Sequence, residues 1–340
     1  MIDAGRYTSG RIAVANLASS IDGLERRRAQ SATFDDLAAL SNLLFVRGDV
    51  LGRIADHDRA EIVAMEAVAL APKTAAALYI QARLAERFHR FAHADALFDR
   101  ALAAGHPGSE IEMGRAALFQ ASGCYSEALV LREWLVQVDR GIHTLGALAS
   151  LLAEMDQWPA AETCYSAALA ADDTVSPFPC GQVLFEWGAS ALRRGDLARS
   201  EELLVELDAI LPGHVPGRGH RAEVALAQGQ LDRAAALIAP LLDTSDDPAY
   251  RATYAEILAA RGDHDGAARE AECAAACYER LLARRPEAYA DHAAAFFTGI
   301  GKRPHRAIEL AYRNWTLRDT PQSRSLLTRA LWSLGRGEVA

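Results

Sequence analysis

The sequence predicts an all-α protein, a superhelical solenoid of about eight helix-turn-helix repeats with a helical cap at each end. Alanine and leucine dominate the apolar residues, and they favour helices because their side chains lose little rotamer freedom there. Helical patterns alternate with short breaks, and this arrangement recurs along the chain. With 340 residues, the chain is long enough for two ordinary domains or one repeat array.

The repeating unit is clearest between Leu184 and Pro212. A helical pattern runs to Arg194, where Gly195 and Asp196 interrupt it, and a second helical pattern follows up to the proline. Gly and Asp are typical of a break between helices, and proline is typical of a helix end. The segment therefore predicts one pair of helices joined by a tight turn.

Small residues occupy the same place in every unit and keep the units in register. Spacings of 34, 34, 33, 39, 34 and 33 separate Ala60, Ala94, Ala128, Ala161, Ser200, Ala234 and Ala267 in the second helices. The matching small residues of the first helices are Gly48, Ala82, Ala116, Ala149, Gly188, Ala222 and Ala255. We expect these positions to let the paired helices approach closely.

This period, with small residues at the helix crossings, resembles the tetratricopeptide repeat (TPR) family over roughly residues 41–315. The resemblance implies a right-handed solenoid of helical hairpins whose first helices line an extended concave surface. Many unrelated systems use this scaffold, so the resemblance indicates a fold rather than an activity.

The predicted order along the chain is a capping region, an array and a second cap. Residues 1–40 are expected to hold an N-terminal capping helix, 41–316 the repeat array, and 317–340 a C-terminal capping helix. Two irregularities interrupt the array. The spacing of 39 against 34 locates an insertion around residues 172–181, and the helix from about residue 265 to 285 is longer than its counterparts.

The predicted function is a non-catalytic scaffold or adaptor that binds a protein or peptide in the concave groove. Exposed side chains of the first helices are polar, with scattered aromatic rings and both signs of charge, which suits a peptide or a partner helix. The alternative for any one of them is that it faces water or packs between hairpins. The predicted groove residues are Asn42, Phe45, Tyr79, Arg83, Glu86, Met113, Gln120, His143, Gln182, Phe185, Glu186, His220 and Glu223.

One established mode of the family is disfavoured. Some members grip a peptide C-terminus with Lys, Asn and Arg on consecutive first helices. The matching positions here hold Phe45 and Asp49, then Ile80, then Glu110 and Gly114. A chaperone-tail adaptor is therefore not expected.

A second hypothesis is an accessory protein or enzyme subunit that holds a small molecule or metal at an irregular repeat. His89 and His93 are four residues apart, but they flank a predicted turn, where water is the expected neighbour. Cys273 and Cys277 share a helical face without the further ligand pair that a closed zinc site needs. We therefore predict no metal, no cofactor and no catalytic residue, and an enzyme is less expected than a scaffold.

A turn rich in glycine and proline offers a candidate site for an acidic ligand. His214, Arg218, His220 and Arg221 surround it. A charged edge that faces water is the alternative interpretation. No nucleotide-binding loop, nucleophile elbow, HExxH or CxxC motif accompanies these residues.

Charge and cysteine content limit the partners. A net charge of −9 makes nucleic acid an unexpected ligand. No apolar stretch has the length of a membrane span, no secretory signal begins the sequence, and five widely spaced cysteines indicate free thiols. The expected location is the cytoplasm.

Trp332 adds apolar surface to the closing helix, which allows a homodimer through that helix.

Overall fold

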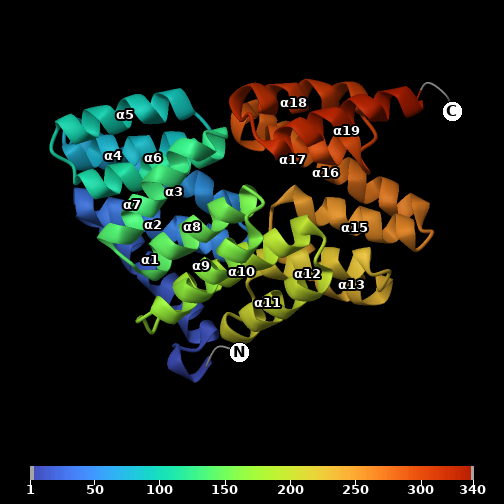
Figure 1. Cartoon of the computed structure of the whole chain (residues 1–340), viewed down its shortest axis with the longest axis horizontal. Coiled ribbons are helices and arrows are strands. Elements are labelled where there is room, and N and C mark those ends of the chain that lie inside the picture. The colour runs from blue at the N-terminus through green and yellow to red at the C-terminus, as the bar shows by residue number, and fades with distance from the viewer. Residues whose placement is uncertain (1–3, 338–340) are drawn as a thin grey trace.

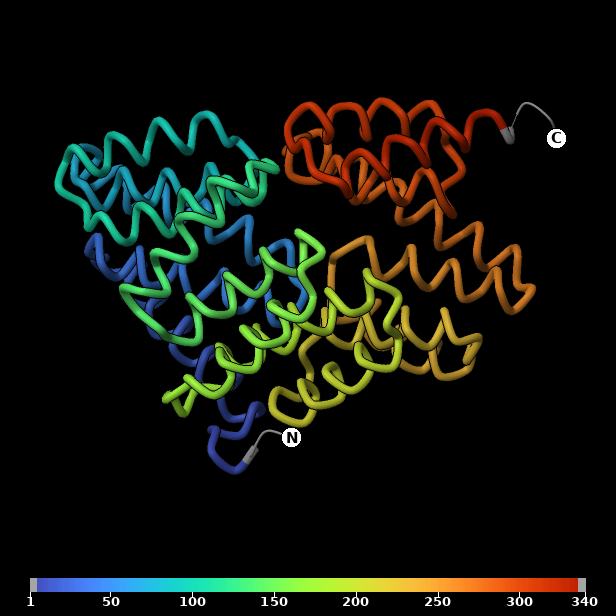
Figure 2. The backbone as a smooth tube through the Cα atoms, viewed as in Figure 1, coloured from blue at the N-terminus to red at the C-terminus, as the bar shows by residue number. Residues whose placement is uncertain are grey.

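Antiparallel helix pairs follow one another in a curved array, and the computed structural model describes residues 4–337 (Figures 1 and 2). Within that range the structure contains helices and no strands, so the predicted all-α solenoid is confirmed. The pairs are α2 (Phe34–Leu51) with α3 (Ile54–Leu70), α4 (Ala75–Arg87) with α5 (Phe91–Ala103), α6 (Gly108–Ser122) with α7 (Tyr125–Val138), α8 (Ile142–Glu154) with α9 (Trp158–Ala171), α10 (Pro177–Arg194) with α11 (Leu197–Ile210), α12 (Val215–Ala227) with α13 (Leu231–Ile238), α15 (Pro248–Ala260) with α16 (His264–Arg284), and α17 (Pro286–Thr298) with α18 (Pro304–Leu317).

Further helices flank and link these pairs. Helix α1 (Gly10–Ser31) packs on α2, and α19 (Pro321–Gly337) packs on α17 and α18. A short 3-10 helix (Ala4–Arg6) precedes α1, and one helical turn, α14 (Leu241–Thr244), links α13 to α15. The exact division of the chain into two caps and an array stays a prediction.

The small residues that set the register lie where the paired helices cross. All seven second-helix positions and all seven first-helix positions named above are buried. At Gly48 the helices approach so closely that a Cβ atom would overlap the ring of His57 on the partner helix. Close contact between these helices therefore depends on the absent side chain, as the repeat pattern predicts.

Both predicted irregularities are present. Helix α10 has 18 residues where α8 has 13, and residues 172–176 form the loop before it. The Asp172 carboxylate holds this loop by accepting hydrogen bonds from the Thr174 amide (3.0 Å) and the Tyr7 hydroxyl (3.0 Å). Helix α16 extends over 21 residues before α17 begins at Pro286.

The array bends far enough to bring its early repeats against its late ones. At the turn between α2 and α3, the backbone amides of Ile54 and Ala55 donate to the Asp246 carboxylate at 2.7 and 2.9 Å. The Ser245 hydroxyl donates to the carbonyl of Gly52 in the same turn. These residues are nearly 200 positions apart, so the contact fixes the curvature of the whole molecule.

Ion pairs and turns continue this line of contact, which we call the seam. Arg285, at the end of α16, contacts both Asp58 and Glu61 on α3. Farther along, the Arg318 guanidinium donates to the carbonyl of Ala121 at 3.0 Å. The seam thus joins the first three helix pairs to residues 244–322, and the superhelix closes on itself.

Candidate functional site

Three adjoining cavities lie along the inner face of the superhelix, and together we call them the inner groove. The α2–α4 cavity has a volume of about 590 Å³, the central cavity about 600 Å³ and the α6–α10 cavity about 410 Å³. Asp49 and Arg87 line both the first and the central cavity, while Gln182 and Glu186 line both the central and the third. The inner groove is therefore continuous.

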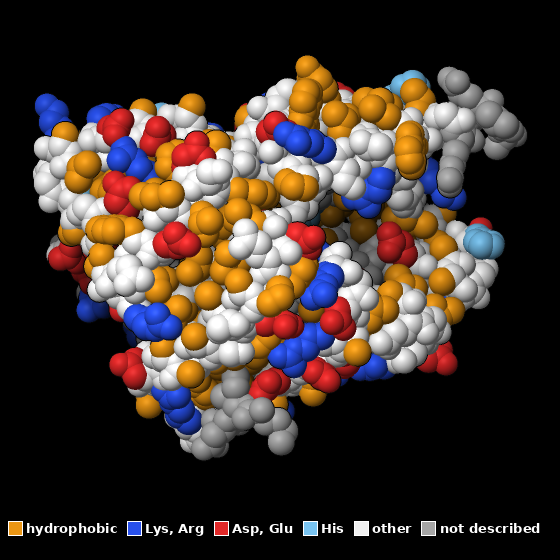
Figure 3. Space-filling view, viewed as in Figure 1, with side chains coloured by type: hydrophobic (Ala, Val, Ile, Leu, Met, Phe, Trp, Pro, Cys, Tyr) orange, Lys and Arg blue, Asp and Glu red, His pale blue; other side chains and the backbone are white. Residues whose placement is uncertain are grey.

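First helices supply most of the lining of the inner groove. Side chains of α2 and α4 line the first cavity, and those of α6, α8 and α10 line the third. The central cavity lies at the seam, where α2 contacts α12 and where side chains of α10 and α15 complete the lining. Figure 3 shows a hollow beside α15, between α12 and the C-terminal helices, on a face where apolar, acidic and basic side chains are mixed.

The α2–α4 cavity gathers five predicted groove residues. Arg83 pairs with Glu86 at 2.6 Å, while Asn42, Phe45 and Tyr79 supply an amide and two aromatic rings. Burial raises the pKa of Glu86, although the charge of Arg83 opposes it. The cavity therefore offers apolar rings beside a compensated pair of charges, which suits an amphipathic chain better than a single ion.

The central cavity gathers the predicted residues of α10 and α12. The Phe185 ring stacks on His220 with centroids 5.3 Å apart, and His220 Nδ1 lies 2.9 Å from the Glu223 carboxylate. Gln182 donates to Glu186 at 2.9 Å, and burial raises the pKa of that glutamate. Side chains of both helices thus form one polar surface with an aromatic ring at its centre.

At the turn before α12, two of the four residues of the candidate anion site, His214 and Arg221, have partners within the protein. His214 is buried, and it caps the helix by accepting a hydrogen bond from the Gly217 amide at 3.0 Å. Burial lowers its pKa to about 4, so the ring is neutral near pH 7. Arg221 pairs instead with Glu201 and Asp208, each at 3.2 Å. The histidine and the arginine therefore do not converge on one ligand.

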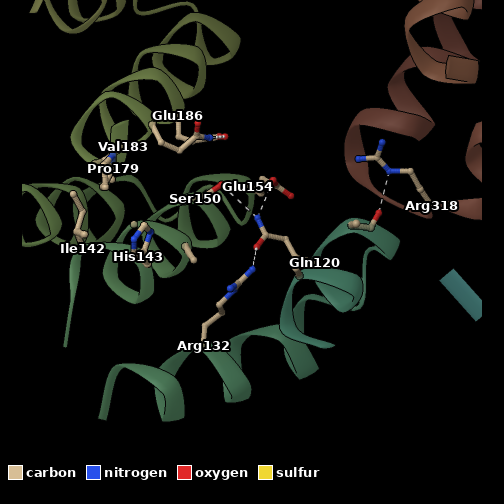
Figure 4. A pocket seen from close by; sticks show the side chains of 15 residues that line it. Gln120, Arg132, Ile142, His143, Ser150, Glu154, Pro179, Val183, Glu186 and Arg318 are labelled. Atoms are coloured by element: carbon tan, nitrogen blue, oxygen red, sulfur yellow. Dashed lines mark hydrogen bonds between the residues drawn. The ribbon is translucent and has the colours of Figure 1, made fainter. Parts of the chain in front are cut away.

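The α6–α10 cavity is organised around Gln120 (Figure 4). Its amide nitrogen donates to Glu154 at 3.1 Å and to Ser150 at 3.4 Å, and its oxygen accepts from Arg132 at 3.4 Å. His143 lines the same cavity from α8. An arginine, an amide, a hydroxyl and a carboxylate thus face one space at the inner surface.

The structure places two cavity-lining side chains where the sequence analysis did not look for them. Arg132 belongs to the second helix α7, and Arg318 follows α18, yet both line the α6–α10 cavity. Met113, by contrast, lines none of the three cavities within residues 4–337. It lies one helical turn before Ala117, the first residue of α6 that lines the α6–α10 cavity. The remaining predicted residues all line the inner groove, although their contact with a partner is untested.

The histidine and cysteine pairs lie outside these cavities. His89 is not a solvated turn residue as expected, because its ring packs at the seam and contacts the carbonyl of Glu287 at 3.1 Å. Cys273 is exposed, and the Cys277 sulfur lies 3.0 Å from the Arg280 guanidinium. Between residues 4 and 337, no three His, Cys, Asp or Glu side chains are grouped as a metal ion would require.

Membrane insertion is a separate question for a helical chain. Within the part of the sequence that the structure describes, every helix is too short or too polar to span a bilayer.

Comparison with known proteins concerns the fold. Tetratricopeptide repeat families match residues 147–214 and 191–257. The Cut9–Hcn1 hetero-tetramer of the APC/C superposes with a TM-score of 0.53 at 16% identity, over 92% of this chain and 58% of the other. This chain thus spans less than two thirds of that protein.

Two further solved structures have lower scores than the Cut9–Hcn1 structure. PilW, a type IV pilus biogenesis factor, has a TM-score of 0.48 at 17% identity, with 62% of this chain and 94% of PilW covered. A tetratricopeptide repeat protein from Parabacteroides merdae has a TM-score of 0.47 at 16% identity, with 88% and 98% covered. Among curated protein sequences, none matches this chain.

Proposed function

Because the chain is a tetratricopeptide repeat solenoid, we propose that it is a non-catalytic scaffold that holds a protein or peptide segment in its inner groove. The observation that carries this proposal is the continuity of the three cavities through shared residues. A continuous groove that follows successive first helices suits an extended segment, which presents alternate side chains and backbone amides along its length.

The lining chemistry supports a peptide ligand. Phe45, Tyr79 and Phe185 provide rings for apolar side chains, and aromatic anchors carry much of the energy at protein interfaces. Gln120 and Gln182 provide amides that can exchange their internal hydrogen bonds for bonds to a peptide backbone. Aromatic and amide groups at intervals along the inner groove favour recognition of an extended peptide.

Electrostatics favours protein over nucleic acid in this proposal. The net charge is −9, and the carboxylates of Asp49, Glu186, Glu223 and Asp247 outnumber the arginines Arg53 and Arg87 in the lining of the central cavity. A phosphate backbone would meet repulsion there, since nucleic-acid sites depend on clustered Lys and Arg. We place the scaffold in the cytoplasm, and no observation on residues 4–337 favours the alternative of a bound small molecule or metal.

Selection from a displayed library of random peptides tests the proposal. Wild-type protein is compared with a triple variant of the inner groove, Tyr79→Ala, Arg83→Glu and Phe185→Ala. We expect the wild type to enrich a defined peptide set and the variant to bind its members at least about 10-fold more weakly, because three anchors are lost. Fluorescence anisotropy with synthetic peptides gives the dissociation constants.

A matched variant of the outer helices provides the control. Arg100→Glu, Trp134→Ala and Tyr312→Ala change one charge and two rings at exposed positions of α5, α7 and α18. This variant should bind the selected peptides as the wild type does. Equal losses in both variants, or no peptide enriched by the wild type, would contradict the proposal.

The proposal includes self-association through α19. Trp332 is 71% exposed and lies beside Leu331, which is also exposed, so the helix presents an apolar edge that its own neighbours leave uncovered. A second copy of the chain is the proposed occupant. Sedimentation equilibrium should give a dimer for the wild type and a monomer for Trp332→Glu, while a monomeric wild type at high concentration would refute this part.

A further inference from the structure

We propose that the α6–α10 cavity binds a carboxylate of the segment held in the inner groove, with Arg132 as its counter-charge. The inference rests on the proposed function and adds the chemical class of group that one part of the groove recognises. Its basis is a buried cation at the wall of a cavity, with no carboxylate within ion-pair distance among the described residues.

Arg132 is only 8% exposed, yet its guanidinium is poorly satisfied. One hydrogen bond, from Nη2 to the Gln120 amide oxygen, has a length of 3.4 Å, and Nε is buried without a partner. Within residues 4–337, no carboxylate lies within ion-pair distance of Arg132. Burial lowers its pKa to about 10, so the group is still charged near pH 7. A buried charge without a partner is destabilising unless something supplies the missing charge.

Three other arginines that line the inner groove have acidic partners, and a fourth, Arg53, is exposed and donates to the carbonyl of Thr244. Arg83 pairs with Glu86 at 2.6 Å, Arg87 contacts Asp49, and Arg318 pairs with Asp291 at 3.0 Å. These contacts keep each guanidinium compensated without a ligand. Arg132 differs from all four because it is buried and its one hydrogen-bond partner is a neutral amide, so the α6–α10 cavity has at its wall a positive charge with no carboxylate in direct contact.

The surroundings of Arg132 favour a carboxylate over a phosphate. Glu86 and Glu154 lie near enough to stabilise the guanidinium charge, and Glu186 lines the same cavity. These side chains repel any anion, and they repel a dianion more strongly than a carboxylate, which brings a single charge. Its two oxygens also match the planar fork of a guanidinium. The cavity volume of about 410 Å³ accommodates a terminal residue or an acidic side chain.

Arg132 lies on a second helix, and this distinguishes the site from the peptide C-terminus clamp of other family members, which this sequence lacks. That clamp uses side chains of consecutive first helices, whereas Arg132 extends from α7 across to Gln120 on α6, as Figure 4 shows. Gln120 in turn reaches Ser150 and Glu154 on α8. A carboxylate at Arg132 would therefore contact a network that links two repeats.

The first test uses N-acetylglycine as a probe of a peptide carboxylate and N-acetylglycinamide as the neutral control. The Nε–Hε cross-peak of Arg132 in a 1H–15N spectrum of the full chain reports on the guanidinium. We expect N-acetylglycine to shift this peak saturably in the millimolar range and the amide to leave it in place. No shift with N-acetylglycine, or equal shifts with both probes, would overturn the proposal.

Two variants test whether the charge and its shape matter. Arg132→Met should abolish N-acetylglycine binding and leave the melting temperature unchanged or higher, because the cost of burying a charge without a direct ion pair is gone. Arg132→Lys should bind more weakly than the wild type, because an ammonium cannot form the bidentate contact. A fall in melting temperature with N-acetylglycine binding retained in Arg132→Met would show that the residue is structural.

Peptides selected from the library separate this inference from the proposed function. Amidation of the C-terminus removes one source of carboxylate, and Asp→Asn with Glu→Gln removes the other. We expect one of these changes to weaken wild-type binding by about 10- to 100-fold and to have little effect in Arg132→Met. If peptides bind the groove but neither change matters, the carboxylate site is wrong and the scaffold stands. If no peptide binds, the scaffold proposal is wrong, and the experiments with N-acetylglycine and N-acetylglycinamide still test the carboxylate site.

Discussion

Arg285 is the residue at which the closure of the superhelix can be tested most directly. Its guanidinium contacts Asp58 and Glu61 and covers the ring of Phe88, with the charge 4.0 Å from the ring centroid. The side chain is only 12% exposed. Replacement by methionine keeps much of the apolar stem and removes the charge that joins the end of α16 to α3.

The expected loss lies between the limits for exposed and buried ion pairs. Breaking a buried pair costs about 3–5 kcal/mol, whereas an exposed pair contributes about 1 kcal/mol or less. Here each carboxylate keeps another arginine, since Asp58 lies 2.7 Å from Arg284 and Glu61 lies 3.5 Å from Arg90. We therefore assign about 2 kcal/mol to the two pairs. The contact with the ring contributes about 1 kcal/mol more, which gives about 3 kcal/mol.

Amide hydrogen exchange at the seam measures this loss of stability. The amides of Ile54 and Ala55 donate across the seam to Asp246, so opening of the seam exposes them. A loss of about 3 kcal/mol corresponds to about 100-fold faster exchange of these amides in Arg285→Met. Small-angle scattering should show a larger radius of gyration if the open form becomes populated.

Arg306→Met is the matched control, because Arg306 pairs with Glu279 at 2.8 Å and Glu309 at 2.7 Å, away from the seam. It should leave the exchange of Ile54 and Ala55 unchanged. Equal exchange in both variants and the wild type would refute the assignment of seam stability to Arg285.

Three further substitutions test the core, the helix crossings and the pH response. Phe98→Ala should lower the free energy of unfolding by about 3–5 kcal/mol in urea titrations, because Phe98 is fully buried, whereas Leu102→Ala on the exposed side of α5 should cost far less. Gly48→Ala should destabilise the protein by about 1–3 kcal/mol, since the new methyl overlaps His57; a neutral result would mean that the pair relaxes freely. The pKa of His214 is about 4 in the folded protein, against about 6.5 unfolded, so stability present above pH 6.5 is lost as pH falls through 4. His214→Asn keeps a helix cap without titrating, so between pH 7 and 4.5 it should lose about 2–3 kcal/mol less than the wild type, and parallel losses would contradict the burial argument.

The repeat fold could be predicted because its determinants are local. A small residue at each crossing, such as Ala60, and a break such as Gly195–Asp196 each act within one helix pair, and their period is visible in the sequence. The insertion before α10 and the length of α16 could be predicted for the same reason. Each is a departure from a spacing that the other units establish.

The seam could not be predicted in this way. It depends on the small rotation between successive pairs, which accumulates over the array until Arg285 reaches Asp58. No local pattern specifies that sum, and the two residues are more than 200 positions apart. The central cavity, which forms at the same junction, was hidden for the same reason.

Arg132 did leave a signal in the sequence. Ala128, Arg132 and Leu135 follow one another at i, i+4 and i+7, so they share the buried face of α7. A charge within an apolar stripe marks a side chain that must find a partner or a ligand. Attention to first helices alone, which the family resemblance encouraged, passed over it.

The seam also has a consequence for the kinetics of ligand exchange. A segment in a groove that the chain itself encircles must thread in by an end or wait until the seam opens. On the second route, both association and dissociation follow the opening rate of the seam. Salt screens partly exposed pairs such as Arg284–Asp58, so it should accelerate both steps together. While the closed form predominates, the affinity changes little, and residence time rather than occupancy responds to ionic strength.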